Sequence, residues 1–274
     1  MDNLQNHNTI PRPLEAFIVI LGSIFLTLFF IAAIGAISAL KDPQSLEHSS
    51  TQIILIITGE LGLGIVPLIY LFKKKYPLRI LYRLNIPETK ILLLIIPLSL
   101  SLTIVSDEID RIVGLFFTPP EELQHVFDLF RNASFPELLL LILGTVFIAP
   151  IAEEASYRGF LQISLERHYN VTSAVIYSSL FFAITHFLLV WTIQIFLIGV
   201  VLGYLAWRTK SLLPSIICHS INNAIALFTV KKGEAVATYY EWHGHISPLF
   251  LIPAILILVL GIRFLDSYYR EKPY

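Results

Sequence analysis

The sequence predicts an all-α, polytopic bundle of about eight membrane-spanning helices, with both termini in the cytoplasm. Two observations carry this prediction. The 274 residues are 55% hydrophobic and only 14% charged, with a mean hydropathy of +0.73, whereas soluble domains carry about 25% charged residues. The apolar residues also form continuous runs rather than alternating strands, and backbone groups in hydrocarbon must be hydrogen-bonded internally. The runs therefore predict helices.

Eight apolar segments account for the predicted spans, each near or slightly under the roughly 20 residues that cross a bilayer. They cover residues 14–40, 51–72, 90–106, 136–157, 172–190, 192–207, 212–230 and 248–265. The first is much longer than the roughly 7–15 apolar residues of a signal peptide, so we expect an uncleaved span. The fifth and sixth are nearly fused, with only 187–192 available as a turn, which predicts a tight helical hairpin.

The distribution of basic residues supports this topology. With the N-terminus inside, all but five of the 19 Lys and Arg residues fall in inside segments, as the positive-inside rule requires. Those five are Lys41, Arg111, Arg131, Lys231 and Lys232. The formal net charge of −1 gives no reason to expect a nucleic-acid partner. We therefore expect a multi-pass protein of the cell membrane that is in contact with the lipid bilayer.

Two connections between the predicted spans are longer than a turn. Residues 73–90 mix basic and apolar side chains, which favours a short helix lying on the anionic inner leaflet. Residues 107–135 favour a surface helix over the outer face, after a Thr-Pro-Pro motif. The single cysteine, Cys218, excludes an internal disulfide and a CxxC-type zinc site, and we expect it to be buried.

The first cluster of polar residues lies near the inner end of the fourth predicted span, within 149–159. Ionisable residues inside spans are costly and usually mark function. Glu154 and Arg158 are four residues apart, so they share a helix face and are expected to form an ion pair. Glu153 points about 100° away and is expected to face a cavity, where it can act as a general base. The alternative is that both glutamates are solvated at the membrane interface.

Two further clusters lie in the fifth and seventh predicted spans. The fifth contains Phe182 and His186, although a lone histidine on an apolar helix is more often a satisfied core residue. The seventh contains His219 and Asn223, which are four apart and can donate hydrogen bonds to one oxyanion. The alternative for this pair is interhelical hydrogen bonding that serves packing.

Together the three clusters supply a general base, a second proton carrier and two oxyanion donors, which are the parts needed to hydrolyse an amide with activated water. No GxSxG or HExxH motif points to another hydrolytic mechanism. Buried carboxylates and histidines also form proton relays, so a proton-coupled transporter is an alternative, although no internal repeat supports it. A catalytically silent peptide-binding membrane protein is a third reading.

At these residues the sequence resembles the CAAX-protease and bacteriocin-processing (CPBP, or Abi) family of intramembrane proteases, also called the type II CAAX prenyl endopeptidase family. The family pattern is EExxxR, FxxxH and HxxxN (or D) on successive helices, matched here at 153–158, 182–186 and 219–223. The resemblance divides the chain into N-terminal spans with surface loops (1–135), a catalytic helical core (136–230), and an outer loop with the C-terminal span (231–274).

The resemblance implies a membrane-embedded, glutamate-dependent endopeptidase. The catalytic residues would be Glu153, Glu154, His186, His219 and Asn223, supported by Arg158 and Phe182. Glu153 and His186 would activate the attacking water, while His219 and Asn223 would hold the tetrahedral oxyanion. The substrate would be a membrane-associated peptide or protein, and a prenylated C-terminal CAAX peptide and a leader peptide fit equally well.

The motifs leave the use of a metal open. A metal-free enzyme without a cofactor is favoured, because no two histidines have the close spacing of a familiar zinc motif. The alternative is zinc held by Glu153, His186 and His219 with an open water position.

Other polar residues are weaker candidates. Glu60 lies in the second predicted span among three glycines within 59–64, which indicate close helix packing, and it could line the same cavity as the motifs. Glu241, His243 and His245 could bind a metal in principle, but a solvated loop is the simpler expectation.

Overall fold

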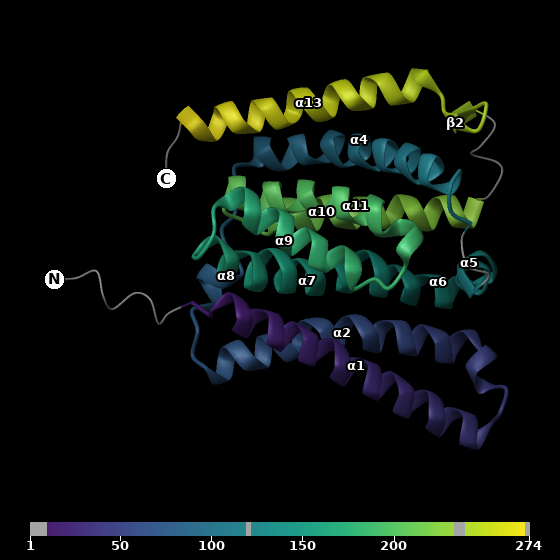
Figure 1. The fold of residues 1–274 in the computed structure, drawn as a ribbon. Helices are drawn as coiled ribbons and strands as arrows, with labels where there is room; N and C mark the ends of the chain where they lie inside the picture. The colour runs from purple at the N-terminus through teal and green to yellow at the C-terminus, as the bar shows by residue number, and fades with distance from the viewer. Residues whose placement is uncertain (1–9, 119–121, 233–238, 272–274) are drawn as a thin grey trace. The chain divides into compact units, whose positions relative to one another are not determined.

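The computed structural model describes residues 10–118, 122–232 and 239–271, and within them seven helices are long and apolar enough to cross a membrane (Figure 1). The chain is therefore a multi-pass integral membrane protein with an all-α fold. These helices correspond to seven of the eight predicted spans. They are α1 (Pro13–Lys41), α2 (Ser49–Lys73), α4 (Thr89–Gly114), the long helix Phe135–Glu166, α10 (Leu189–Thr209), α11 (Leu213–Lys232) and α13 (Pro248–Glu271).

The remaining predicted span, 172–190, forms the shorter helix α9 (Val171–Ile184) of 14 residues. At 1.5 Å per residue it is about 21 Å long, less than the roughly 30 Å of hydrocarbon. The predicted tight corner between α9 and α10 is present, but it covers residues 185–188 and so begins earlier than expected. Phe187 closes the corner with a left-handed φ of 56°, which is unusual for a bulky side chain.

Packing groups the helices into two units. Unit 1 contains Met1–Asn85 and Ala133–Ser178, and unit 2 contains Ile86–Asn132 and Ser179–Tyr274. Helix α9 begins in unit 1 and ends in unit 2. The units group helices by contact, whereas the three-part division at 135 and 230 follows the motifs, and that division stays a prediction.

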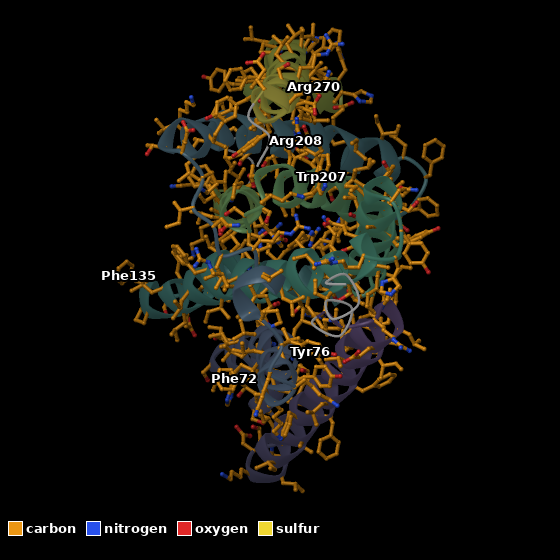
Figure 2. All side chains as sticks on the ribbon, turned by 90° about the vertical axis from the view of Figure 1, so that its left-hand side faces the viewer. Phe72, Tyr76, Phe135, Trp207, Arg208 and Arg270 are labelled. Atoms are coloured by element: carbon orange, nitrogen blue, oxygen red, sulfur yellow. The ribbon has the colours of Figure 1, made fainter. Side chains whose placement is uncertain are left out.

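Unit 2 is built around α4, which contacts α10, α11 and α13. Its core consists of Ile91, Ile95, Leu98, Leu102, Ile198, Leu202, Leu205, Cys218, Leu265 and Tyr269. Cys218 is buried in this core, as predicted. Figure 2 shows Trp207, Arg208 and Arg270 near the ends of α10 and α13, where Arg208 and Arg270 both form ion pairs with Asp266. Arg208 and Arg270 lie in the last turns of α10 and α13.

The other end of α4 carries a structure that the sequence did not predict. Strands β1 (Glu241–Trp242) and β2 (His245–Ile246) form a small antiparallel hairpin, and Glu241, His243 and His245 are exposed on it, as expected of a solvated segment. The Glu108 carboxylate contacts His245 Nδ1 and accepts a hydrogen bond from the backbone N–H of Ile246, each at 2.7 Å. Arg111 pairs with Glu241 at 2.7 Å. The predicted surface helix within 107–135 is confirmed as α5 (Glu122–Asn132), which packs on α11.

In unit 1 the helix Phe135–Glu166 is continuous but not uniform. It consists of α6 (Phe135–Leu141), a π-helical segment η3 (Ile142–Ile148), α7 (Ala149–Glu154), a second π-helical segment η4 (Ala155–Leu161) and α8 (Gln162–Glu166). A capping box starts it, because the Glu137 carboxylate accepts a 2.8 Å hydrogen bond from the backbone N–H of Ser134. The short 3₁₀ turn η2 (Ser45–Glu47) connects α1 to α2.

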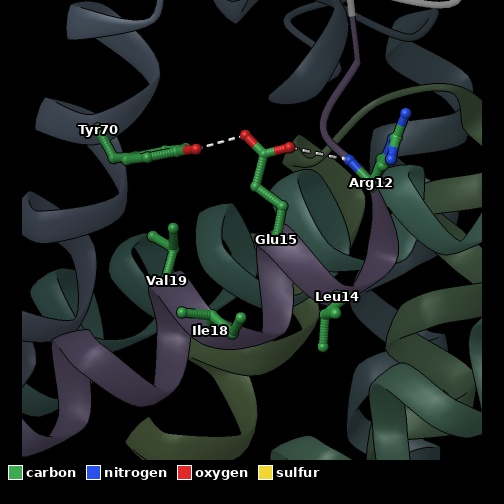
Figure 3. A pocket seen from close by; sticks show the side chains of 6 residues that line it. All are labelled: Arg12, Leu14, Glu15, Ile18, Val19 and Tyr70. Atoms are coloured by element: carbon green, nitrogen blue, oxygen red, sulfur yellow. Dashed lines mark hydrogen bonds between the residues drawn. The ribbon is translucent and has the colours of Figure 1, made fainter.

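The beginning of α1 is fastened to the end of α2 (Figure 3). Glu15 accepts hydrogen bonds from the Tyr70 hydroxyl, from the Tyr76 hydroxyl at 2.9 Å and from the backbone N–H of Arg12 at 3.2 Å. Burial and the bond to Glu15 raise the pKa of Tyr76 to about 12, so Tyr76 stays a hydrogen-bond donor at neutral pH. A shallow apolar cavity flanks this contact, lined by Leu14, Ile18 and Val19 beside the polar groups.

The connection 73–90 differs from the expected helix on the inner leaflet. Only one helical turn forms, α3 (Leu78–Leu81), and the basic residue that follows it turns inward. Arg83 is 4% exposed and contacts Glu166, at the end of α8, at 2.5 Å. Burial lowers the pKa of Arg83, and the carboxylate of Glu166 opposes that effect. This loop therefore binds the end of the carboxylate-bearing helix rather than lying free on the membrane.

Candidate functional site

The two glutamates of the first motif lie in α7, between the π-helical segments η3 and η4. A π-helical segment has more residues per turn than an α-helix, so it alters the direction of the side chains that follow, and such segments are frequent at functional sites. The second one is supported from outside, because Ser178 Oγ donates a hydrogen bond to the carbonyl of Tyr157 at 2.9 Å. Glu153 and Glu154 of unit 1 therefore lie in a short α-helical stretch between two π-helical segments.

The predicted ion pair between Glu154 and Arg158 is confirmed. Arg158 Nη1 lies 3.0 Å from Glu154 Oε1, and both side chains are 0% exposed. Two buried opposite charges stabilise each other, and removing one of them leaves the other buried without compensation. The reading in which both glutamates are solvated is wrong, because Glu153 is also buried. Glu154 therefore forms a buried ion pair with Arg158.

Glu153 has a different partner. Its carboxyl group lies close enough to the carboxyl group of Glu60 in α2 for the two to interact electrostatically. Glycine allows the two helices to come this close, since a Cβ atom at Gly64 would lie only 2.8 Å from Cβ of Ala152. The weak sequence candidate Glu60 therefore does lie beside the glutamate of the motif. The sequence feature that indicated this position was an ionisable residue, flanked by glycines, within an apolar span.

In unit 2 the Phe182 ring contacts both histidines of the motifs. The ring centroids of Phe182 and His186 are 4.7 Å apart at 80°, and those of Phe182 and His219 are 6.0 Å apart at 86°. Both are edge-to-face arrangements, which aromatic rings prefer over face-to-face stacking. Phe182 therefore contacts two imidazoles, one from the end of α9 and one from α11, and its supporting role stays a prediction.

The hydrogen bond of His186 assigns roles to its two nitrogens. Nδ1 lies 2.8 Å from the carbonyl oxygen of Phe182. A carbonyl oxygen can only accept a hydrogen bond, so Nδ1 carries the proton, and Nε2 of the neutral ring is free to take one up. His186 is half-buried at the end of α9, immediately before the left-handed Phe187. Its role as a proton carrier stays a prediction.

His219 and Asn223 lie one turn apart on α11, with His219 buried and Asn223 half-buried. The neighbouring Asn222 accepts a hydrogen bond from Thr103 Oγ1 of α4 at 3.2 Å. Gln194 of α10 similarly donates to the carbonyl of Ser106 in α4 at 3.2 Å. The amides at 222 and 194 thus serve packing within unit 2, a role that their sequence context did not distinguish from that of Asn223.

The predicted site residues therefore form two clusters. Unit 1 brings together Glu153 and Glu60 and, separately, Glu154 and Arg158, while unit 2 brings together the residues of the second and third motifs. In the described part of the chain no three His, Cys, Asp or Glu side chains form a group that could hold a metal ion.

Comparison with known proteins agrees with the motifs. Residues 135–225 match the family model described as type II CAAX prenyl endopeptidase Rce1-like. The match covers about a third of the chain and includes all three motifs. It confirms the resemblance to the CAAX-protease family. Neither the curated proteins nor the solved structures contain a match to the chain.

Proposed function

We propose that the chain is an intramembrane endopeptidase that hydrolyses a peptide bond near the membrane with water activated by Glu153 and His186. The observation that carries the proposal is the match of residues 135–225 to an endopeptidase family, with every polar residue of the three motifs present in apolar helices. The protein lies in the cell membrane with both termini in the cytoplasm, in keeping with its distribution of Lys and Arg.

Glu153 is the general base. Its carboxyl group is buried in α7, next in the chain to the ion pair of Glu154 with Arg158. A carboxylate positioned within hydrogen-bonding reach of a water molecule can act as a general base. It can therefore take a proton from the attacking water, a role that contributes about 10²–10⁴-fold in enzymes generally.

His186 is the second proton carrier, and His219 with Asn223 forms the oxyanion hole. Because Nδ1 of His186 is held by a carbonyl, Nε2 can accept a proton from the water or pass one to the leaving amine. The imidazole of His219 and the amide of Asn223 lie on one face of α11 and can donate to the oxygen of the tetrahedral intermediate. No serine or cysteine acts as nucleophile.

The substrate is a membrane-associated peptide, and both a prenylated C-terminal peptide and a leader peptide are consistent with the motifs. The test is cleavage by the purified protein of a farnesylated CAAX peptide, the same peptide without the lipid, and a leader peptide. Glu153→Gln keeps the size of the side chain and removes its basicity, so it is the matched control. A chelator arm tests whether the activity needs a metal.

Cleavage by the wild type that disappears in Glu153→Gln supports the proposal, and the preferred peptide defines the substrate class. Absence of cleavage from all three peptides, or cleavage that is indifferent to Glu153, contradicts it. That outcome would favour a silent peptide-binding protein or a transporter.

A further inference from the structure

The second π-helical segment, η4, is hydrogen-bonded to two neighbouring helices through serine hydroxyls. Ser178 Oγ, in α9, donates to the carbonyl oxygen of Tyr157 at 2.9 Å. One residue earlier in η4, Ser156 Oγ donates to the carbonyl oxygen of Leu63 in α2 at 3.0 Å. All four residues belong to unit 1, and both serines are buried. The segment that follows the two glutamates is therefore held by specific polar contacts and not only by apolar packing.

The carbonyl of Tyr157 also accepts a hydrogen bond that makes this stretch π-helical. The backbone N–H of Gln162 donates to it across five residues, whereas an α-helical bond joins residues four apart. A carbonyl oxygen has two lone pairs, so it can accept from Gln162 and from Ser178 at the same time. The Ser178 hydroxyl thus adds to the π-helical bond instead of competing with it.

A second serine of the same long helix shows what is particular about Ser178. Ser164 Oγ donates to the carbonyl of Phe160, four residues earlier in its own helix, at 2.7 Å. Such a bond forms within any helix and needs no neighbour. The hydroxyl of Ser178 instead reaches η4 from 21 positions away in the chain. Because π-helical segments are rare and short, a donor from a neighbouring helix at this carbonyl favours the π-helical register over the α-helical one.

The register of η4 matters for the glutamates that precede it. Glu154 is the last residue of α7, and its ion-pair partner Arg158 lies inside η4. Beyond η4, helix α8 is anchored by the 2.5 Å contact between Arg83 and Glu166. Successive residues differ by about 100° around a helix axis, so a change of register by one residue would turn α7 relative to α8 by about that angle. The direction of the Glu153 side chain therefore depends on η4 staying π-helical.

We propose that Ser178 is a positioning residue for the general base: its hydroxyl stabilises the π-helical register of η4 and thereby fixes the direction of Glu153. Ser178 acts through the backbone of Tyr157 and not on the reacting atoms. The support of η4 is a property of the folded chain, whereas the catalytic consequence rests on the proposed function.

Two adjacent serines give a matched pair of variants. Ser178→Ala removes the donor to Tyr157 and should lower kcat about 10-fold with little change in KM, since a small displacement of a catalytic group slows the chemical step. Ser178→Cys keeps a weak S–H donor, so its kcat should be intermediate. Ser179 is equally buried, and its hydroxyl makes no hydrogen bond within the described part of the chain. Ser179→Ala should therefore keep the kcat of the wild type.

Hydrogen exchange measured by mass spectrometry tests the support of η4 without any activity. Residues 155–162 should exchange about 2- to 10-fold faster in Ser178→Ala than in the wild type, the factor expected for the loss of one neutral hydrogen bond. The same residues in Ser179→Ala, and the distant helix α4 in both variants, should exchange at the rate of the wild type.

Equal exchange of residues 155–162 in Ser178→Ala and Ser179→Ala would overturn the proposal, as would faster exchange throughout the chain of Ser178→Ala. A kcat of Ser178→Ala equal to that of the wild type would overturn the positioning role even where exchange is locally faster. If the wild type cleaves no peptide but the local exchange pattern is found, the proposed function fails together with the catalytic consequence, and the support of η4 by Ser178 stands.

Discussion

The two clusters of motif residues are held by different kinds of interaction. In unit 1 the glutamates lie in the middle of a 32-residue helix, where Glu154 is paired with Arg158 and Glu153 interacts electrostatically with Glu60. In unit 2 the imidazoles of His186 and His219 are held by a phenylalanine ring and a backbone carbonyl, near the end of a 14-residue helix and within α11.

The difference follows from charge. A carboxylate buried in apolar surroundings needs a proton, a cation or hydrogen-bond donors nearby, so its partners are built into the same packed unit. A neutral imidazole needs only to be oriented and given the correct tautomer, for which one carbonyl and one ring edge suffice. We therefore expect changes around the glutamates to affect both stability and activity, and changes around the histidines to affect mainly activity.

The largest expected effect is on catalysis. Glu153→Ala should lower kcat by about 10²–10⁴-fold or more, because it removes the general base. The protein should remain folded in the membrane, with some loss of stability, because the ion pair of Glu154 with Arg158 is retained. Initial rates and thermal unfolding of the same preparation check both statements. Normal turnover in this variant would show that the assigned mechanism is wrong.

The largest expected effect on stability comes from the buried ion pair. Arg158→Met leaves the Glu154 carboxylate without its cation and should lower the free energy of unfolding by about 3–5 kcal/mol. Glu154→Gln should be destabilising in the same way. Combining Glu154→Gln with Arg158→Met removes both charges and should restore part of the loss. Unchanged unfolding and activity in all three variants would show that the ion pair of Glu154 with Arg158 contributes nothing to either.

The contact between α2 and α7 predicts an intermediate effect. Gly64→Ala forces a methyl group against the backbone of Ala152 and should cost about 1–3 kcal/mol in unfolding free energy, as overpacking generally does. Gly22→Ala is the matched control, because no atom lies within 4 Å of the added Cβ. Similar unfolding curves for the two variants would show that α2 does not pack as closely as described.

In the histidine cluster the expected effect on stability is no larger than that of Gly64→Ala. Phe182→Leu keeps an apolar side chain in the core but loses both edge-to-face contacts, each worth about 0.5–1.5 kcal/mol. Activity should fall by a larger factor than stability, because His186 and His219 lose the ring that orients them. A variant that loses stability but keeps full activity would contradict the positioning role of Phe182.

Much of the fold could be predicted because hydropathy alone determines it. Long apolar runs must form helices in a bilayer, and i, i+4 spacing on a helix predicted the pair Glu154–Arg158. The π-helical segments around α7 were not predictable, since they depend on packing against neighbouring helices rather than on residue type. The shortness of α9 was missed for a related reason, because its apolar run continues through the left-handed corner at Phe187.

Polar contacts between residues far apart in the chain also could not be predicted from the sequence. Arg83 sits in a run of basic residues that all suggest an exposed membrane-facing loop, yet its partner Glu166 lies 83 positions away in the chain. Glu60 showed a weak signal as a lone carboxylate in an apolar span, but its interaction with Glu153 depends on the packing of two helices. The hairpin at 241–246 likewise depends on Glu108, far away in sequence.

The central claim is that the carboxylate and histidine clusters serve one reaction. A double-mutant cycle between Glu153→Ala and His186→Ala, measured as kcat/KM on the preferred peptide, tests it most directly. Residues that act as a unit have non-additive effects. The account predicts that the double variant is no slower than the slower single variant. Independent, multiplying losses would contradict it.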